Sequence, residues 1–269
     1  MNLQDRVVVV TGAGSGIGRA TALLFAKQGA RIAACDVDQG RLDALATELG
    51  DRRLVVRRTD VSDRAQMSAF AGAVHALAPA ADVVINNAGV GLGGTFLDTS
   101  LDDFDWILGI NLRGVIHGCH FFVPNMVEAK RGGHVVNISS ILGIYGPPSV
   151  TAYAATKFAV RGFSESLRAE LIPHKIGVTA ICPGMINTSI IADGRLQGET
   201  LVARKSKMER TFKRGLAPEK VADVILSAVH HNPAVRTVGT DAHVIAALQR
   251  FAPNTLARLG RRVKSRLGV

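Results

Sequence analysis

The residues of this chain best suited to chemistry are a tyrosine and a lysine four positions apart, Tyr153 and Lys157. In a helix, positions i and i+4 share one face, so both side chains would project into the same space. A tyrosine with a pKa of about 10 is a weak base at neutral pH, but a lysine ammonium one turn away favours the phenolate and lowers that pKa. Ser140 lies upstream, at the expected end of a strand, where its hydroxyl could hold a substrate oxygen. We therefore predict a proton-transfer site, with a buried packing tyrosine as the alternative interpretation.

A glycine-rich turn points to a second ligand. An apolar run leads into TGAGSGIG at residues 11–18, with glycines at 12, 16 and 18. Such glycines let the backbone approach a pyrophosphate closely, and the helix that follows offers free N–H groups. Asp36 ends the next apolar run, where a carboxylate accepts hydrogen bonds from an adenosine ribose and repels a 2′-phosphate. With no Arg or Lys inside the turn or directly after Asp36, the pattern favours NAD over NADP. An ordinary tight turn and a surface acid are the alternatives.

The elements that must position these residues alternate along the chain. Apolar runs predict buried strands at 6–12, 31–36, 53–58, 82–89, 134–140, 177–184 and 234–239. Helical patterns occupy 17–28, 39–49, 63–78, 102–129, 152–172 and 218–230. Strands that are apolar throughout have both faces covered, and strand–helix alternation builds a parallel sheet. We predict a single-domain α/β fold, a Rossmann-type doubly wound parallel sheet of about seven strands with helices on both faces.

Taken together, the motifs resemble the short-chain dehydrogenase/reductase family over roughly residues 5–240. The glycine turn is similar to its TGxxxGIG motif, Asn86-Asn87-Ala88-Gly89 to its NNAG motif, and Tyr153 with Lys157 to its YxxxK pair. The resemblance implies an NAD(P)-dependent oxidoreductase with a catalytic set of Asn111, Ser140, Tyr153 and Lys157. It implies a cofactor site made of Gly12, Ser15, Gly16, Ile17, Gly18, Asp36, Asp60, Val61, Asn87, Ala88, Gly89, Tyr153, Lys157, Pro183, Gly184, Ile186 and Thr188.

The resemblance also assigns roles within these sets. Asp60 and Val61 would contact the adenine ring, and the segment from Pro183 would receive the nicotinamide carboxamide. Asn111 would kink its helix and hold a water in a proton relay through Lys157, although a structural polar group in a helix interior is the alternative. The family spacing to the tyrosine selects Ser140, and neighbouring side chains of a strand point to opposite faces. Ser139 is therefore expected to hydrogen-bond locally.

Composition and charge exclude several other classes of protein. A hydrophobic content of 47% is too high for a disordered chain. The three cysteines are too scattered for a disulfide framework and are expected to be inert core thiols in a reducing, cytoplasmic setting. The histidine pairs at 117/120 and 230/231 lack a third ligand, so no metal site is predicted. We also expect no signal peptide, no membrane-spanning segment and no nucleic-acid partner.

Two segments stand apart from the dehydrogenase domain predicted for residues 1–252. Residues 189–215 form a long charged insertion after a strand end, which favours a substrate lid over a solvated helix pair. Residues 253–269 form a basic amphipathic tail, with an apolar stripe at 256, 259, 263 and 267. Such a tail could pack on the protein or a neighbouring subunit, or lie on an anionic membrane surface.

The substrate is predicted from the residues expected beside the tyrosine. They are mainly apolar: Leu92, Ile141, Leu142, Tyr145, Val150, Met185, Ile190 and Ile191. We therefore predict an NAD-dependent oxidoreductase that interconverts a hydrophobic secondary alcohol and its ketone, as a homo-oligomer. The alternatives are an NADPH-dependent reductase of 3-oxoacyl-type ketones and a catalytically silent dinucleotide sensor.

Overall fold

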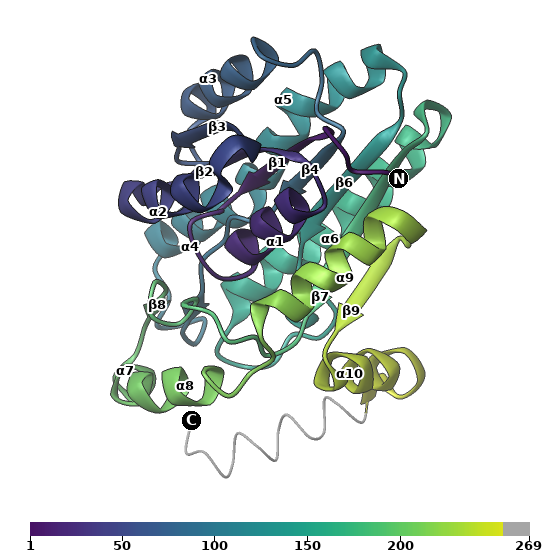
Figure 1. Cartoon of the computed structure of the whole chain (residues 1–269). Coiled ribbons are helices and arrows are strands. Elements are labelled where there is room, and N and C mark those ends of the chain that lie inside the picture. Colours follow the sequence, from purple (N-terminus) through teal and green to yellow (C-terminus); the bar gives the residue numbers. More distant parts are fainter. Residues whose placement is uncertain (255–269) are drawn as a thin grey trace.

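The computed structural model describes residues 1–254, which form one α/β unit around a seven-stranded sheet (Figure 1). The strands follow the order β3-β2-β1-β4-β6-β7-β9, and every pairing is parallel. Their bounds are β1 (Val7–Thr11), β2 (Arg31–Asp36), β3 (Arg53–Arg58), β4 (Val83–Asn86), β6 (Gly133–Ile138), β7 (Ile176–Pro183) and β9 (Val235–Val238). The predicted doubly wound fold is confirmed, and each predicted strand is present. The basic tail from residue 255 onward lies outside the described residues.

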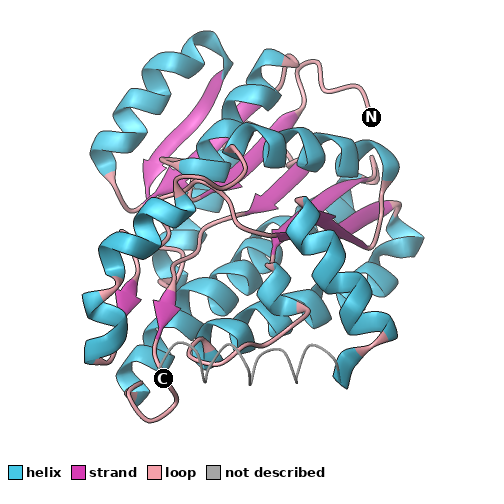
Figure 2. Cartoon of the chain, turned by 90° about the horizontal axis from the view of Figure 1, so that it is seen from below, coloured by secondary structure: helices cyan, strands magenta, loops and turns pink. Residues whose placement is uncertain are grey.

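Helices cover both faces of the sheet, as Figure 2 shows from below. One face carries α1 (Gly16–Lys27), α2 (Gln39–Leu49) and α9 (Pro218–His231), packed on a core that includes Phe25, Leu45 and Ile225. The other carries α3 (Arg64–His75), α5 (Gly114–Ala129) and α6 (Thr151–Leu171), packed on Phe70, Phe122 and other apolar residues. Because both faces are covered, central strands such as β1 and β4 are buried along their whole length, as apolar runs require.

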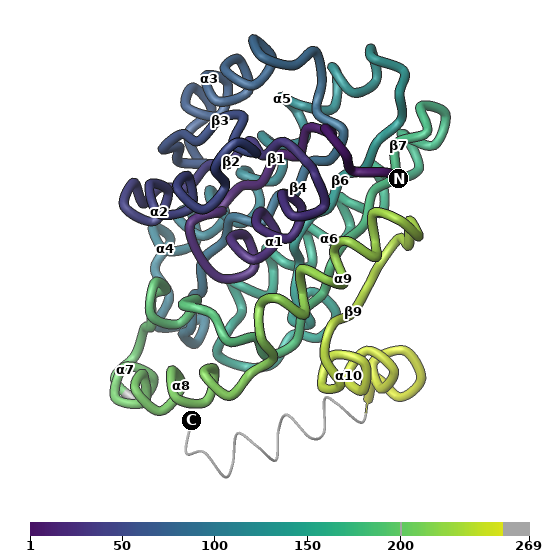
Figure 3. Tube along the Cα trace, viewed as in Figure 1, coloured from purple at the N-terminus to yellow at the C-terminus, as the bar shows by residue number. Residues whose placement is uncertain are grey.

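The smaller elements gather at the end of the sheet where the strands terminate. In Figure 1, α7 (Glu199–Ala203), α8 (Lys205–Phe212) and α10 (Thr240–Phe251) lie below the end of β9. A two-stranded parallel sheet joins β5 (Leu92–Gly93) to β8 (Arg195–Leu196). The tube in Figure 3 follows the chain from β7 through α7 and α8 and back up into α9. Short 3-10 helices occur at η1 (Gly50–Arg52), η3 (Ile141–Gly143) and η4 (Ile172–His174).

Three features differ from the sequence prediction. The helix expected at 102–129 is divided into α4 (Leu101–Leu108), a π-helical segment η2 (Gly109–Arg113) and α5. The small β5–β8 sheet was not expected, because two-residue strands have no periodicity to detect. Helix α10 was also missed, although Gly239 followed by Asp241 is a reasonable helix start.

Buried polar groups of the core include a histidine, His134, near the start of β6. Its Nε2 lies 2.9 Å from the Thr179 hydroxyl, which donates to the Pro233 carbonyl, so the ring nitrogen must be the donor. Burial lowers the pKa of His134 from 6.5 to about 4. The folded chain therefore keeps the ring neutral under conditions where the unfolded chain binds a proton.

From this shift we predict acid destabilisation. The free energy of unfolding should fall as the pH drops from about 6.5 to about 4, by up to about 3 kcal/mol from this residue. Urea unfolding at pH 7.0, 5.5 and 4.5 measures the effect. A His134→Gln variant, which cannot titrate there, should have a flatter profile over that window; equal slopes for both proteins would contradict the prediction.

Two further observations concern the described residues only. Cys35, Cys119 and Cys182 are free and buried, and burial raises the pKa of the Cys119 thiol to about 12 and that of Cys182 to about 11. Within residues 1–254, no helix is long and apolar enough to cross a membrane.

Candidate active site

Tyr153, Lys157 and Ser140 meet at the carboxyl edge of the sheet. Tyr153 and Lys157 lie in the first two turns of α6, and Ser140 lies two residues after the end of β6. Ser140 and Tyr153 share a side-chain hydrogen bond. The Lys157 Nζ lies 5.6 Å from the centroid of the tyrosine ring and donates to the Ile138 carbonyl over 3.1 Å. The three side chains thus form one group, with the lysine beneath the tyrosine.

A tight crossing between η3 and α6 holds this group together. Gly143 lies so close to α6 that a Cβ there would be 2.6 Å from the Lys157 carbonyl oxygen. The Ser139 hydroxyl donates to the same carbonyl over 2.7 Å. Ser139 therefore ties the strand end to α6, and the expectation that it would hydrogen-bond locally was wrong. Ser140 instead accepts from the Leu142 N–H, which leaves its hydroxyl proton free for Tyr153 or a substrate.

The pKa values of the pair correct one part of the sequence argument. The sequence predicted that Lys157, together with the positive charge of an oxidised nicotinamide, would lower the pKa of Tyr153. In the structure, burial raises the pKa of Tyr153 to about 12, and the Ser140 hydrogen bond only opposes that rise. Burial also lowers the pKa of Lys157 to about 8. Burial is the largest cause of both shifts, because each charged form is poorly solvated inside the protein.

Asn111 lies in the π-helical segment and is completely buried. Its Oδ1 accepts from the Val90 N–H over 2.8 Å, and its Nδ2 donates to the Val90 carbonyl and to the Thr156 hydroxyl. A Cβ on Gly89 would lie 3.3 Å from the Asn111 Oδ1 and 3.4 Å from the Lys157 Nζ. Asn111 and Lys157 therefore both lie beside the backbone at Gly89. The wider turn of the π-helix places the side-chain amide of Asn111 close to this backbone.

The glycine turn fits a dinucleotide. Gly12 and Gly16 have φ angles of 63° and 50°, which favour glycine, and a Cβ on Gly18 would lie 2.1 Å from the Gly12 carbonyl oxygen. Ser15 precedes α1 but its side chain does not cap the helix, so the N–H groups of the first turn remain available to a phosphate. Ile17 packs against the core below. These residues suit the pyrophosphate of NAD(P).

The NNAG segment supports this turn from below. Asn87 donates from Nδ2 to the carbonyls of Thr11 and Gly12, each over 3.0 Å. The Thr11 hydroxyl accepts from the Asn87 and Ala88 N–H groups. Asn87 therefore fixes the turn rather than pointing into open space, and Ala88 and Gly89 carry the chain on toward Asn111 and Lys157.

Asp36 ends β2, and Asp60 lies two residues beyond the end of the neighbouring strand β3. The Asp36 carboxylate accepts from the Gly14 N–H over 2.8 Å and the Asp38 N–H over 3.0 Å. Each of its oxygens keeps a lone pair that could accept from a ribose hydroxyl. Asp60 instead accepts from the Ser62 N–H and hydroxyl, and Val61 is buried.

The segment after β7 passes over the glycine turn. Gly184 donates to the Val238 carbonyl, and the Met185 N–H donates to the Asp241 carboxylate over 2.8 Å, so α10 holds this segment from outside. Ile186 is buried, and a Cβ on Gly16 would lie 3.0 Å from the Thr188 methyl group. The stretch that begins at Pro183 therefore reaches the place where the glycine turn begins α1.

Residues 189–197 are fastened at two points. Arg41 of α2 pairs with both oxygens of Asp193, over 3.0 and 3.3 Å. Arg195 pairs with the buried Asp103 over 2.9 Å and stacks 4.0 Å from the Trp106 ring. Together with the β5–β8 pairing, these contacts hold the segment across the carboxyl edge of the sheet.

The apolar residues predicted to face the substrate lie around Tyr153. Leu92 belongs to a buried cluster that also contacts the tyrosine, and Ile141 and Leu142 belong to the cluster at η3. Val150 bridges to Gly94 just before α6. Tyr145, Ile190 and Ile191 are half-buried and Met185 is exposed.

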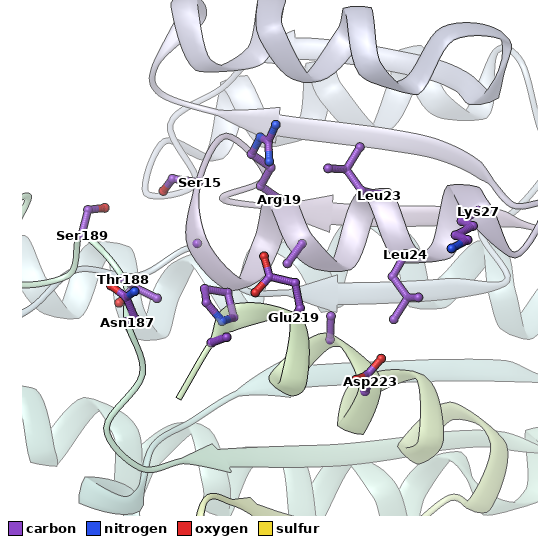
Figure 4. A pocket seen from close by; sticks show the side chains of 15 residues that line it. Ser15, Arg19, Leu23, Leu24, Lys27, Asn187, Thr188, Ser189, Glu219 and Asp223 are labelled. Carbon is purple, nitrogen blue, oxygen red and sulfur yellow. The ribbon is translucent and has the colours of Figure 1, made fainter. Parts of the chain in front are cut away.

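A separate cavity of about 610 Å³ lies between α1 and α9 (Figure 4). Ser15, Thr188 and Ser189 lie at one end of it, and Lys27 lies at the other. None of the four proposed catalytic residues lines it. The cavity adjoins the glycine turn at Ser15 and Gly16 and lies apart from the proposed catalytic residues.

Sequence reasoning missed the residues that fasten the carboxyl edge: Arg41, Asp103, Asp193, Arg195 and Asp241. These pairs join positions far apart in the chain, so no local pattern reveals them. The only available signal was the concentration of charge in residues 189–215.

Comparison with known proteins decides the family. A family model described as short chain dehydrogenase matches residues 6–197. The chain belongs to the short-chain dehydrogenase family. Residues 6–197 therefore form an oxidoreductase domain, and the predicted nicotinamide dinucleotide is confirmed as its class of cofactor.

Individual relatives of this dehydrogenase agree with that assignment. A Mycobacterium tuberculosis protein named "Probable oxidoreductase EphD" is 40% identical over 265 residues, which is 96% of this chain and 45% of that protein. The chain thus spans about half the length of this relative. The 3-oxoacyl-(acyl-carrier-protein) reductase FabG of Thermotoga maritima is 35% identical over 84% of this chain and 91% of its own. A short-chain dehydrogenase/reductase from Burkholderia phymatum, solved with NAD, superposes with a TM-score of 0.87 at 30% identity, covering 95% and 96% of the two chains.

Proposed function

We propose that this dehydrogenase interconverts a hydrophobic secondary alcohol and its ketone with NAD, and that Tyr153 transfers the proton. The observation that carries the proposal is the Ser140–Tyr153–Lys157 group, placed at the same sheet edge as the glycine turn and Asp36. The Tyr153–Lys157 pair disfavours the catalytically silent alternative, and relatives named as oxidoreductases also speak against it.

The chain's own groups would act on the substrate oxygen. Ser140 and Tyr153, which share a hydrogen bond, offer two hydroxyls to one carbonyl or alcohol oxygen. In ketone reduction the Tyr153 hydroxyl gives its proton to that oxygen, and in alcohol oxidation it takes the proton back. The nicotinamide, when bound, supplies or accepts the hydride. Lys157 places a positive charge close to the Tyr153 ring. Asn111 fixes the nearby backbone at Val90 through its hydrogen bonds.

The proposed substrate class rests on the apolar surroundings of Tyr153. The buried cluster around it contains Leu92, Ile107 and Ala152, with Phe104 and Trp106 packed alongside. Such a lining favours apolar substituents over phosphates or carboxylates. The similarity to the FabG reductase of Thermotoga maritima favours a second candidate, reduction of 3-oxoacyl groups with NADPH.

Turnover assays separate the two candidates. Purified protein is offered a panel of secondary alcohols, plain ketones and 3-oxoacyl thioesters, each with NAD(H) and NADP(H). The proposal expects the highest kcat/KM for an apolar alcohol or ketone with NAD(H). A preference for 3-oxoacyl thioesters with NADPH would establish the second candidate instead.

Asp36 gives a prediction about cofactor choice. Asp36→Ala removes the carboxylate proposed to accept from the ribose, so NADH binding should weaken by about 1–3 kcal/mol. NADPH, which lacks that contact, should lose less, and the preference between the two cofactors should narrow. Fluorescence titration of NADH and NADPH measures both affinities. The control is Asp43→Ala, on the exposed side of α2. It removes the same charge and should leave the affinities for NADH and NADPH unchanged.

Further parts of the proposal concern organisation. We propose residues 1–252 as the dehydrogenase domain, 189–215 as a substrate lid within it and 253–269 as a basic tail. The contacts that fasten residues 189–197 across the sheet support the lid.

Oligomeric state and localisation are also part of the proposal. Exposed Ile116 on α5 and Phe158 on α6 favour a homo-oligomer, and the three free cysteines favour the reducing cytoplasm. Peripheral membrane contact by the tail remains the alternative to its packing on the protein.

A further inference from the structure

A cation lies close to the proposed ribose carboxylate: Arg41, in the first turn of α2. Gly14 separates the two: a Cβ there would lie 2.9 Å from the Arg41 Cβ and 3.0 Å from the Asp36 Cγ. Sequence reasoning found no cation directly after Asp36. The turn that leads into α2 nevertheless folds Arg41 back beside the glycine turn, because Asp38 caps the helix and pairs with the Arg41 Nε over 3.2 Å.

Arg41 is not free to receive a ligand in this arrangement. Its two terminal nitrogens donate to the two oxygens of Asp193, so the fork of the guanidinium is occupied by a carboxylate. Asp193 is itself oriented, because its N–H donates to the Ser189 carbonyl and its side chain accepts from the Ser189 hydroxyl. Arg41 holds the pKa of the Asp193 carboxyl below its usual range, so the pair stays ionised at neutral pH.

Neighbouring cations are held in other ways. Arg19 pairs with Glu48, and the Arg58 Nε donates to the Val37 carbonyl over 3.0 Å. Lys205, on the far side of Asp193, reaches the Ala192 carbonyl over 3.4 Å. Arg41 thus flanks Gly14, and Asp193 from the segment after β7 occupies its guanidinium.

A 2′-phosphate on the adenosine ribose needs a cation, and a guanidinium binds phosphate through the same two-pronged geometry that it uses for a carboxylate. We propose that Asp193 is a specificity-determining residue that keeps Arg41 from a 2′-phosphate and so reinforces the choice of NAD made by Asp36. This inference rests on the proposed NAD function and deepens it. The choice between NAD and NADP at the adenosine ribose would then depend on Asp193, an acidic residue in the segment after β7.

Binding measurements on the whole protein test the proposal without any turnover. Asp193→Asn keeps the shape of the side chain and removes its charge, so Arg41 becomes available. Fluorescence titration should show that the Kd for NADPH falls by roughly 3- to 10-fold, while that for NADH changes by less than about 2-fold. In about 1 M salt, where the screening length is about 3 Å, the gain should shrink.

Two variants control the result. Asp5→Asn makes the same charge change at an aspartate that pairs with Arg52 over 2.9 Å, before β1 at the opposite edge of the sheet, and should leave both Kd values unchanged. Adding Arg41→Gln to Asp193→Asn should abolish the gain in NADPH binding. A gain that survives this second change would overturn the assignment to Arg41.

Two further outcomes would contradict either this proposal or the proposed NAD function. Equal changes in the NADH and NADPH affinities of Asp193→Asn would show that the Arg41–Asp193 pair only fastens the segment, and the proposal would be wrong. A wild-type protein that binds NADPH more tightly than NADH would instead contradict the proposed NAD function, and the variant would still report separately on whether Asp193 restrains Arg41.

Discussion

Replacing Tyr153 with phenylalanine should leave a folded protein that binds NADH normally but has lost kcat by roughly two to four orders of magnitude. The ring remains to fill the cluster with Leu92 and Trp106, so packing is kept. What disappears is the hydroxyl that shares a hydrogen bond with Ser140 and would exchange a proton with the substrate. Steady-state kinetics on the best substrate of the panel measure the loss.

Two controls make this result specific. The melting temperature and the NADH Kd of Tyr153→Phe should match those of the wild type, since neither depends on the hydroxyl proton. Lys157→Ala, by contrast, should lose both turnover and cofactor affinity, because the family resemblance includes this lysine in the cofactor site as well as in the catalytic set. A Tyr153→Phe enzyme that keeps a near-normal rate would rule out tyrosine as the proton-transfer group.

The catalytic trio and the glycine turn could be predicted because their signals are local. Tyr153 and Lys157 share one helix, Ser140 ends one strand, and the glycines occupy one turn. The sheet was equally accessible, since each buried parallel strand is a continuous apolar run. The structure shows in addition that η3 crosses α6 and so brings these local features together. Gly143, at that crossing, has no recognisable signal in the sequence.

Features that depend on long-range contact could not be predicted. Arg41 and Asp193 are 152 residues apart in the sequence, and Asp103 and Arg195 are 92 residues apart. The pKa of Tyr153 was misjudged for the same reason: spacing reveals the neighbouring lysine but not the burial of both side chains. Burial is a property of the packed fold, and the spacing of residues along the sequence does not reveal it.

Substituting alanine for Gly18 should be the most damaging small change in the cofactor turn. By helix propensity alone, alanine in α1 would be favourable by about 1 kcal/mol. The added Cβ, however, would lie 2.1 Å from the Gly12 carbonyl oxygen and 2.4 Å from the Asn87 Nδ2. The first of these is backbone, so α1 must move away from the turn, and the hydrogen bond from Asn87 to Gly12 is strained as well.

The expected result is a loss of cofactor affinity of about 100-fold, because a displacement of the order of 1 Å misplaces the N–H groups that face the pyrophosphate. Stability should fall by about 1–3 kcal/mol, as for an overpacked core.

Gly72→Ala in α3 is the matched control, since its added Cβ would meet nothing within 4 Å. That variant should bind NADH normally and be more stable by about 0.5–1 kcal/mol. NADH titration and thermal unfolding of the two variants therefore separate the steric demand of the turn from the intrinsic cost of glycine in a helix, and a Gly18→Ala protein that behaves like Gly72→Ala would show that the turn tolerates a side chain.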